Sequence, residues 1–284
     1  MLAVLGALIA NGLITILKFI GAVLTGSSGM MAESLHSLAD TTNQVFLLLG
    51  LRFYEKPASE KHPFGYGKER FFWSFIAAVF IFGVGATYAI YEGINKVRHP
   101  HIPENLFWAY WILGISLVLE AGSIALALYQ EINEARHEGL GFAEYLRESK
   151  DPTAKTVLFE DSAALLGILI AWAGLLLGQY HVPPYDGTLW DGIASITIGV
   201  VLAIVAFSLA RSSRGLLLGE AATKKSVKRI TDAVKEHPNV VEVVELLTMH
   251  LAPKQILVNA HVNLKNDLTY EEIVQTIADI EENM

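Results

Sequence analysis

The sequence predicts a mainly α-helical membrane protein, with a bundle of six transmembrane helices and a small C-terminal α+β domain. Of its 284 residues, 52% are hydrophobic and only 18% are charged, whereas soluble domains carry about 25% charged residues. The apolar residues form runs of about 20, which at helical rise match the hydrocarbon core of a bilayer. From about residue 220 the sequence turns polar. We therefore expect a membrane domain at residues 1–214 and a soluble domain at residues 215–284.

Polar or turn-forming residues separate the six apolar runs. The first run opens the chain with no basic segment before it and no small-residue cleavage site, so it predicts a membrane helix rather than a signal peptide. The links Gly26–Gly29 and His181–Gly187 contain the turn formers that end one helix before the next begins. The predicted membrane helices cover residues 2–24, 30–54, 71–95, 105–130, 155–179 and 188–211.

Basic residues alternate between the links and indicate an orientation. The links after the first and fifth helices contain no Lys or Arg, and the link after the third contains only Lys96 and Arg98. Cytoplasmic links retain the excess of Lys and Arg, so both termini are predicted to be cytoplasmic. The basic residues on that side are Arg52, Lys56, Lys61, Lys68, Arg70, Arg136, Arg147, Lys150, Lys155, Arg211, Arg214, Lys224, Lys225, Lys228 and Arg229.

Two global properties limit the chemistry. The chain has no cysteine, which excludes disulfides and thiolate metal sites. The formal net charge of −8 is concentrated in the segment before Asp161 and in the soluble part. A lipid bilayer is the partner that the composition predicts, and no nucleic acid is expected.

The soluble part has the order helix, strand, strand, helix. An amphipathic helix at 224–236 is ended by Pro238, and strands are predicted at 240–250 and 255–264. Thr269 and Glu272 have the spacing of a capping box at the start of the last helix. This order is typical of a split βαβ, ferredoxin-like domain, which would need one more strand. We therefore expect the domain to be truncated or disordered at its carboxyl end.

The segment Glu131–Lys155 is polar and rich in both charges. It predicts a cytoplasmic extension of the fourth helix followed by a loop. No chemistry can be assigned to it from the sequence.

The second predicted helix carries ionisable residues on one face. Glu33, His36 and Asp40 lie at i, i+3 and i+7, and Asn43 continues the stripe. A charged side chain in a membrane helix costs on the order of 3 kcal/mol on insertion scales, so it is a functional candidate. Imidazole and carboxylate on adjacent turns form a two-point clamp for a cation such as Zn²⁺.

The fifth helix supplies Glu160 and Asp161, whose side chains point about 100° apart. One is expected to be a ligand, while the other faces a cavity or pairs elsewhere. The alternative for any single polar residue is a hydrogen bond that joins two helices. For the lone acid Glu120, this structural role and a functional role are equally good interpretations. For Asn11, the structural role is preferred. Asp191 opens the sixth helix, where the helix dipole favours an acid without any function.

Weaker candidates lie outside the bundle. Glu60 and His62 in the loop after the second helix could form a surface metal site, although a solvated loop is the simpler interpretation. His250 and His261 on the two predicted strands could be ligands across the sheet, or ordinary surface residues.

Three motifs resemble the cation diffusion facilitator family. His36-Ser-Leu-Ala-Asp40 is similar to the His/Asp-x-x-x-Asp pair of the family's second helix. The segment His62–Arg70 resembles its glycine-rich loop, and Trp190–Ser195 resembles the opening of its sixth helix. The resemblance covers nearly the whole chain. Phe159-Glu160-Asp161 and the polar segment before it resemble the zinc transporter 9 branch.

The resemblance implies a homodimeric antiporter in a prokaryotic inner membrane or an organelle membrane. It would move Zn²⁺ or a neighbouring metal out of the cytoplasm in exchange for protons, and no cofactor beyond the substrate metal is implied. The soluble domain would be metallochaperone-like and would help to dimerise.

The resemblance also implies residue roles. His36 and Asp40 would bind the metal together with a His-x-x-x-Asp pair in the fifth helix, whose aspartate matches Asp161. Val157 stands where the histidine belongs, so Glu160 or Glu33 would have to compensate. Lys68 is similar to the basic residue of a charge interlock near the membrane surface, with Glu220 as a substitute acidic partner.

Other functions remain open at this point. The transported metal could be Mn²⁺, Fe²⁺ or Co²⁺, since protein sites rank these metals only loosely. A membrane metal sensor or enzyme would bind metal without moving it, but the sequence has no His-Glu-x-x-His motif, and so an enzyme is not expected. A channel would conduct metal without proton coupling.

Overall fold

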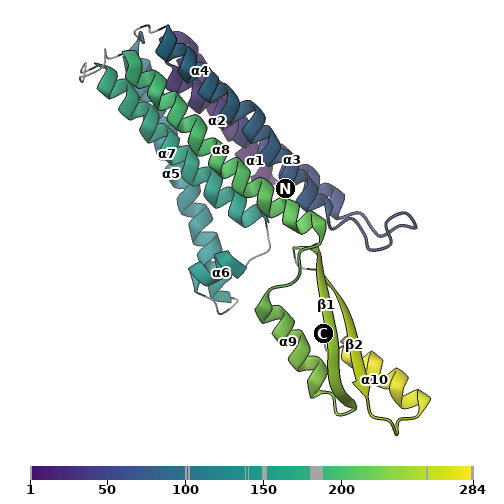
Figure 1. Ribbon diagram of the computed structural model, residues 1–284. Coiled ribbons are helices and arrows are strands. Elements are labelled where there is room, and N and C mark those ends of the chain that lie inside the picture. The colour runs from purple at the N-terminus through teal and green to yellow at the C-terminus, as the bar shows by residue number, and fades with distance from the viewer. Residues whose placement is uncertain are drawn as a thin grey trace.

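The computed structural model describes residues 2–99, 101, 103–137, 139, 141–148, 152–179, 188–253 and 255–282. The chain forms a bundle of long helices, from one end of which a small unit of two helices and a two-stranded sheet extends (Figure 1). The predicted mainly helical architecture with a small α+β unit is therefore correct. Its two strands, β1 (Val240–Ala252) and β2 (Gln255–Leu264), are the two that the sequence predicts.

Every predicted membrane helix is a helix in the structure, and several extend beyond the predicted ends. The third is one continuous rod in which a π-helical segment, η1, lies between two α-helices. The bundle consists of α1 (Leu2–Thr25), α2 (Ser28–Tyr54), α3 (Glu69–Phe80), η1 (Ile81–Ala86), α4 (Thr87–Arg98), α5 (Leu106–His137), α7 (Pro152–Gln179) and α8 (Thr188–Leu218).

Four of these rods are long and apolar enough to cross a bilayer, judged over the described residues. They cover residues 69–98, 106–137, 158–179 and 189–218. α1 contributes a shorter apolar stretch, Asn11–Thr25. α2 is 27 residues long but carries the polar stripe that includes Glu33 and Asp40, which lowers its hydropathy. The membrane character of the bundle is clear, whereas the number of six spans stays a prediction.

Small residues allow α4 and α8 to pack with their backbones in contact. A Cβ atom on Gly93 would lie 2.7 Å from the Gly192 carbonyl oxygen, and one on Gly192 would lie 3.0 Å from the Gly93 carbonyl oxygen. Only glycine fits at this crossing, as is common for helix contacts in membranes. The buried core continues from there along α2, α7 and α8, through Ala39, Ile168 and Leu202.

A buried polar cluster surrounds the turn between α1 and α2. The Asp191 carboxylate accepts hydrogen bonds from Ser27 Oγ at 2.6 Å, Ser28 N at 2.8 Å and Gly29 N at 3.0 Å. Asp191 was predicted to complement the dipole of its own helix, but its carboxylate also caps the amino end of α2. It therefore ties α8 to the start of α2.

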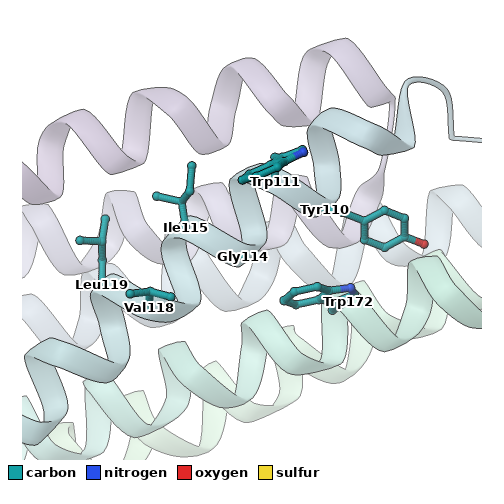
Figure 2. A pocket seen from close by; sticks show the side chains of 7 residues that line it. All are labelled: Tyr110, Trp111, Gly114, Ile115, Val118, Leu119 and Trp172. Carbon is teal, nitrogen blue, oxygen red and sulfur yellow. The ribbon is translucent and has the colours of Figure 1, made fainter.

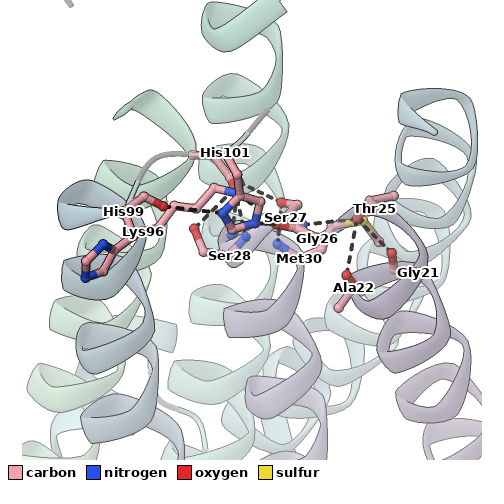
Figure 3. Close-up of polar contacts among 12 residues, drawn as sticks. Gly21, Ala22, Thr25, Gly26, Ser27, Ser28, Met30, Lys96, His99 and His101 are labelled. Carbon is pink, nitrogen blue, oxygen red and sulfur yellow. Dashed lines mark hydrogen bonds and ion pairs between the residues drawn. The ribbon is translucent and has the colours of Figure 1, made fainter. Parts of the chain in front are cut away.

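Lys96 belongs to the same cluster. Its Nζ atom lies 3.6 Å from Asp191 Oδ2 and donates to the Gly26 carbonyl at 2.7 Å. Figure 3 shows Lys96 and His101 converging on Gly26, which His101 Nε2 approaches to 3.0 Å. Lys96 was counted among the link residues, but it is 1% exposed and serves as a buried structural cation.

One side of α5 carries an open apolar groove. Figure 2 shows Tyr110 of α5 beside Trp172 of α7, while Ile115 and Leu119 of α5 point away from Trp172. Many of the lining side chains are strongly exposed, including Trp111 at 57% and Val118 at 72%. Such a surface suits contact with lipid chains. The lining residues are Tyr110, Trp111, Gly114, Ile115, Val118, Leu119 and Trp172.

The polar segment between the fourth and fifth predicted helices is more ordered than expected. α5 continues to His137, as predicted, but the expected loop contains a short helix, α6 (Phe142–Glu148). Tyr145 is the buried anchor of α6, at 7% exposed. Lys150 lies outside the described residues. Figure 1 shows α6 at the end of the bundle from which the soluble unit extends.

The soluble unit follows α8, which runs past residue 214 to Leu218 and ends at Gly219, with a φ of 97°. An antiparallel hairpin pairs its two strands, with Leu246 opposite Ala260, and α9 packs on β1. The predicted capping box is confirmed: Thr269 N donates to Glu272 Oε2 at 2.8 Å. The elements are α9 (Lys224–Glu236), β1 (Val240–Ala252), β2 (Gln255–Leu264) and α10 (Tyr270–Glu282).

Candidate metal site

The polar stripe of α2 faces the interior of the bundle. Ser27 caps the helix by accepting a hydrogen bond from Met30 N at 3.1 Å, and the helix then continues without a break to Tyr54. This regularity places the stripe on one face. Glu33 is 0% exposed, and His36 and Asn43 are each 1% exposed.

His36 and Asp40 lie together on adjacent turns of α2. The distance from His36 Nε2 to Asp40 Oδ2 is 3.4 Å. Neither ring nitrogen of His36, nor Asp40 Oδ1, has a hydrogen-bond partner among the described residues. Buried polar atoms are nearly always satisfied, so unsatisfied ones mark a place where a polar ligand fits.

The two acids of α7 diverge, as their 100° separation predicts. Glu160 is buried and accepts a hydrogen bond from Asn43 Nδ2 of α2. Its carboxyl group also lies close enough to that of Asp40 to interact with it. Asp161 faces α5 instead, where its Oδ2 accepts a hydrogen bond from Ser123 Oγ at 3.1 Å. Of the two acids, Glu160 is therefore the one that meets α2.

Glu33 lies nearer the amino end of α2 and has a different partner. Its Oε2 atom lies 3.2 Å from Nζ of Lys18, on α1. The same Nζ atom donates to Ser37 Oγ at 2.7 Å and lies 3.9 Å from Glu120 Oε1 of α5. The acid Glu120, which looked isolated in the sequence, thus belongs to a charged group.

Lys18 is the residue that sequence reasoning missed. It is the one charged residue in the first predicted helix, between Leu17 and Phe19. The cost of a charge in a membrane helix was the signal that could have found it.

The structure places His36 next to Asp40, and Asp40 next to Glu160. Glu33 pairs with Lys18, and Asp161 accepts a hydrogen bond from Ser123. Across the described residues, however, no three His, Asp or Glu side chains converge closely enough to form a ready-made metal centre. The side chain of Val157 lies outside the described part of the chain.

The weaker candidates outside the bundle are not assembled into sites. Glu60 and His62 are exposed, and the His62 ring lies against Tyr66, with the ring centres 4.5 Å apart. In the sheet, His250 is opposite Ile256 while His261 is opposite Glu245. Five residues of strand separate the two histidines, roughly 16 Å. The structure does not bring them together.

Lys68 contacts the end of α8 where the soluble unit begins. It donates to the Leu217 carbonyl at 3.3 Å and lies 3.9 Å from Met249 Sδ of β1. The backbone of Glu220 contacts β1 at this junction, where its carbonyl accepts a hydrogen bond from His250 N at 3.1 Å. Lys68 and Glu220 thus lie at the same junction, where Lys68 donates to a backbone carbonyl.

Residues 4–218 match the family model described as the cation efflux transmembrane domain. The chain therefore belongs to the cation efflux family, the cation diffusion facilitators, which the motifs predicted. The family is one of transporters and not of enzymes.

Several curated relatives refine this placement. The chain is 35% identical to the proton-coupled zinc antiporter SLC30A9, mitochondrial, of Homo sapiens, over 84% of this chain and 41% of that protein. It is 36% identical to metal tolerance protein C4 of Arabidopsis thaliana, over 80% of this chain and 49% of that protein. It is 28% identical to the cation-efflux pump FieF of Shewanella oneidensis, over 92% of this chain and 80% of that protein. The chain thus spans less than half the length of the first two relatives.

Proposed function

We propose that the chain is a divalent metal cation transporter that exports Zn²⁺ from the cytoplasm in exchange for protons. The observation that carries the proposal is the meeting of Asp40 on α2 with Glu160 on α7, beside His36, inside the bundle. Paired ionisable residues inside a membrane bundle are typical of ion pathways. The printed names of the zinc antiporter and the efflux pump among the relatives agree with it.

The proposed ligands are His36, Asp40 and Glu160. One imidazole and two carboxylates are a donor set that Zn²⁺ accepts, and water would complete a four-coordinate shell. Their unsatisfied buried atoms support this choice. Glu33 and Asp161 would stand beside the shell, since Lys18 and Ser123 already engage them. Glu160 would thereby supply the ligand that the sequence lacks at Val157.

Proton exchange follows from the chemistry of these ligands. Imidazole and carboxylate bind a metal only in their deprotonated forms, so protons and metal compete for the same atoms. A transporter that alternates access to one site would therefore release protons from these ligands when it takes up metal on one side. It would take up protons when it releases the metal on the other side.

We further propose a homodimer with six transmembrane helices and both termini in the cytoplasm, divided near residue 214 into membrane and soluble domains. The alternation of basic links supports the orientation. The basic loop at 55–68, α6 and the soluble unit all lie at one end of the bundle (Figure 1), as a common cytoplasmic side requires. The host membrane would be a prokaryotic inner membrane or an organelle membrane.

Transport of Mn²⁺, Fe²⁺ or Co²⁺ is the second candidate. The observation that favours it is the replacement of a second imidazole by Glu160, which leaves an oxygen-rich donor set. Oxygen donors suit Mn²⁺ better than an all-imidazole site would. Competition of each metal against zinc uptake separates the two candidates.

Metal flux into proteoliposomes tests the proposal. Asp40→Ala removes a ligand and is expected to abolish zinc uptake driven by a proton gradient, while Asp267→Asn in an exposed turn of the soluble unit leaves it unchanged. Full uptake by a folded Asp40→Ala variant would exclude this site.

A further inference from the structure

Lys18 is a fully buried cation in α1, beside the candidate metal site. Its ammonium group lies 3.2 Å from Glu33 Oε2, donates to Ser37 Oγ at 2.7 Å, and lies 3.9 Å from Glu120 Oε1. The side chain of Lys18 is 0% exposed. A lysine this deep in a membrane bundle needs partners of opposite charge, and it has two.

The polar stripe of α2 therefore consists of two parts. Toward the amino end, Glu33 and Ser37 hold the ammonium group of Lys18. Toward the carboxyl end, Asp40 and Asn43 face Glu160 on α7, and the charge of Lys18 also reaches Asp40. The first part already contains a cation and leaves one buried oxygen, Glu33 Oε1, without a hydrogen-bond partner among the described residues. The second part leaves both ring nitrogens of His36 and a carboxylate oxygen each of Asp40 and Glu160 without one.

Glu33 would be a competent metal ligand without this lysine. It lies three residues before His36 on the same face of α2, the spacing of a two-point clamp. The Glu33 carboxylate is neutralised by the ammonium group, and a second cation at that place would be repelled by it.

We propose that Lys18 is a resident cation that limits each chain to one divalent ion. It keeps the Glu33 and Glu120 carboxylates paired, so that the ion binds at His36, Asp40 and Glu160. This inference rests on the proposed transport function and deepens it. Lys18 itself touches no metal and acts through Glu33.

Zinc binding to the purified full chain in detergent, in competition with a chelating dye, tests the proposal. Lys18→Met has a similar length without charge, so it releases Glu33. We expect it to bind a second zinc equivalent, or to bind the first roughly tenfold more tightly. Lys18→Arg keeps the charge, and it should bind one zinc with wild-type affinity. The double variant Lys18→Met with Glu33→Gln removes both charges of the pair and should also behave as wild type.

Two results overturn the proposal. A folded Lys18→Met variant with the zinc stoichiometry and affinity of wild type would show that Lys18 does not restrict zinc binding. A double variant that gains as much as Lys18→Met would show that Glu33 is not the group being restrained.

A second comparison covers the case in which Lys18→Met does not fold, since removing one partner of a buried pair is strongly destabilising. Glu33→Gln alone removes the nearer of the two carboxylates that balance the ammonium group of Lys18, and it is expected to weaken zinc binding by about tenfold. Adding Lys18→Met to it should restore the affinity. Equal affinities of Glu33→Gln and the double variant would contradict the proposal.

The same assay separates this proposal from the transport function. If Asp40→Asn binds zinc as tightly as wild type, the transport site is wrong. If Asp40→Asn loses zinc binding while all Lys18 variants bind zinc as wild type does, the transport site stands and only the proposed role of Lys18 is wrong.

Discussion

Neighbouring acids on one helix have different tasks because a helix turns 100° at each residue. Glu160 faces α2 and accepts a hydrogen bond from Asn43, while Asp161 faces Ser123 on α5. Sequence reasoning could state that only one of the two would face the site. It could not state which, because the rotation of α7 about its axis is set by packing against α2, α5 and α8.

The hydrogen bond from Asn43 is expected to matter for metal binding. Groups that orient a metal ligand typically contribute a factor of about 10 to 100 in affinity. Asn43→Ala should therefore weaken zinc binding by roughly that factor, measured by dye competition. Ser123→Ala, which releases Asp161, serves as the matched control and should leave the affinity near wild type. Weaker binding in Ser123→Ala and normal binding in Asn43→Ala would assign the ligand to Asp161.

The pH dependence of one cap can be predicted outside the membrane. The Glu272 carboxylate accepts hydrogen bonds from the backbone N–H and the hydroxyl of Thr269, and these hold its pKa below the ordinary value of 4.5. Because the pKa is lowered in the folded state, the cap stabilises α10 above the unfolded pKa. This stabilisation is lost as the pH falls through the folded pKa.

Hydrogen exchange of the first turn of α10 measures this cap. Thr269→Ala should raise exchange there, in line with the ~1 kcal/mol that a lost N-cap typically costs. Glu272→Gln should remove most of the difference between protection at neutral pH and protection below the folded pKa. Unchanged protection in both variants would show that packing, and not the cap, holds the start of α10.

Helix starts in the bundle depend on contacts that are distant in sequence. Asp191 of α8 caps α2 and pairs with Lys96 of α4, although these residues are far apart along the chain. The sequence predicted α2 and α8 as separate helices with starts correct within two residues, although α8 runs on from the predicted end at residue 211 to Leu218. It could not show that one supplies the cap of the other, because such a contact exists only after the helices pack.

Breaking this buried pair should cost stability without touching the metal site. Asp191→Leu removes the carboxylate that pairs with Lys96 and that accepts hydrogen bonds from four donors on Ser27, Ser28 and Gly29. Losses of about 3–5 kcal/mol are typical when one partner of a buried pair is removed. Thermal unfolding in detergent should show a clearly lowered melting temperature. Asp191→Asn, which keeps an acceptor oxygen, should lose less. A melting temperature equal to wild type in Asp191→Leu would mean that the cluster is not structural.

Regular elements were predictable because apolar periodicity, turn residues and caps are local signals. The two strands, α9 and the capping box of α10 were found from such signals alone. The π-helical η1 and the short α6 were missed. Both depend on how neighbouring elements pack, η1 against α8 and α6 against α5.

The chain contains no cysteine, so a single introduced cysteine is the only thiol that a maleimide can label. Such labelling tests directly which end of the bundle faces which side of the bilayer. Ser59→Cys lies in the basic loop after α2, and His99→Cys lies at the other end of the bundle, after α4. A membrane-impermeant maleimide should label Ser59→Cys from the cytoplasmic side and His99→Cys from the opposite side. Labelling of both from one side would contradict the proposed topology.

Zinc flux into proteoliposomes under a proton gradient, compared between Glu160→Gln and Asp161→Asn, tests the meeting of α2 and α7 most directly. The account predicts that Glu160→Gln abolishes proton-driven zinc uptake, since it removes the carboxylate that faces Asp40, and that Asp161→Asn retains most of it. Loss of uptake in Asp161→Asn together with normal uptake in Glu160→Gln would contradict the account.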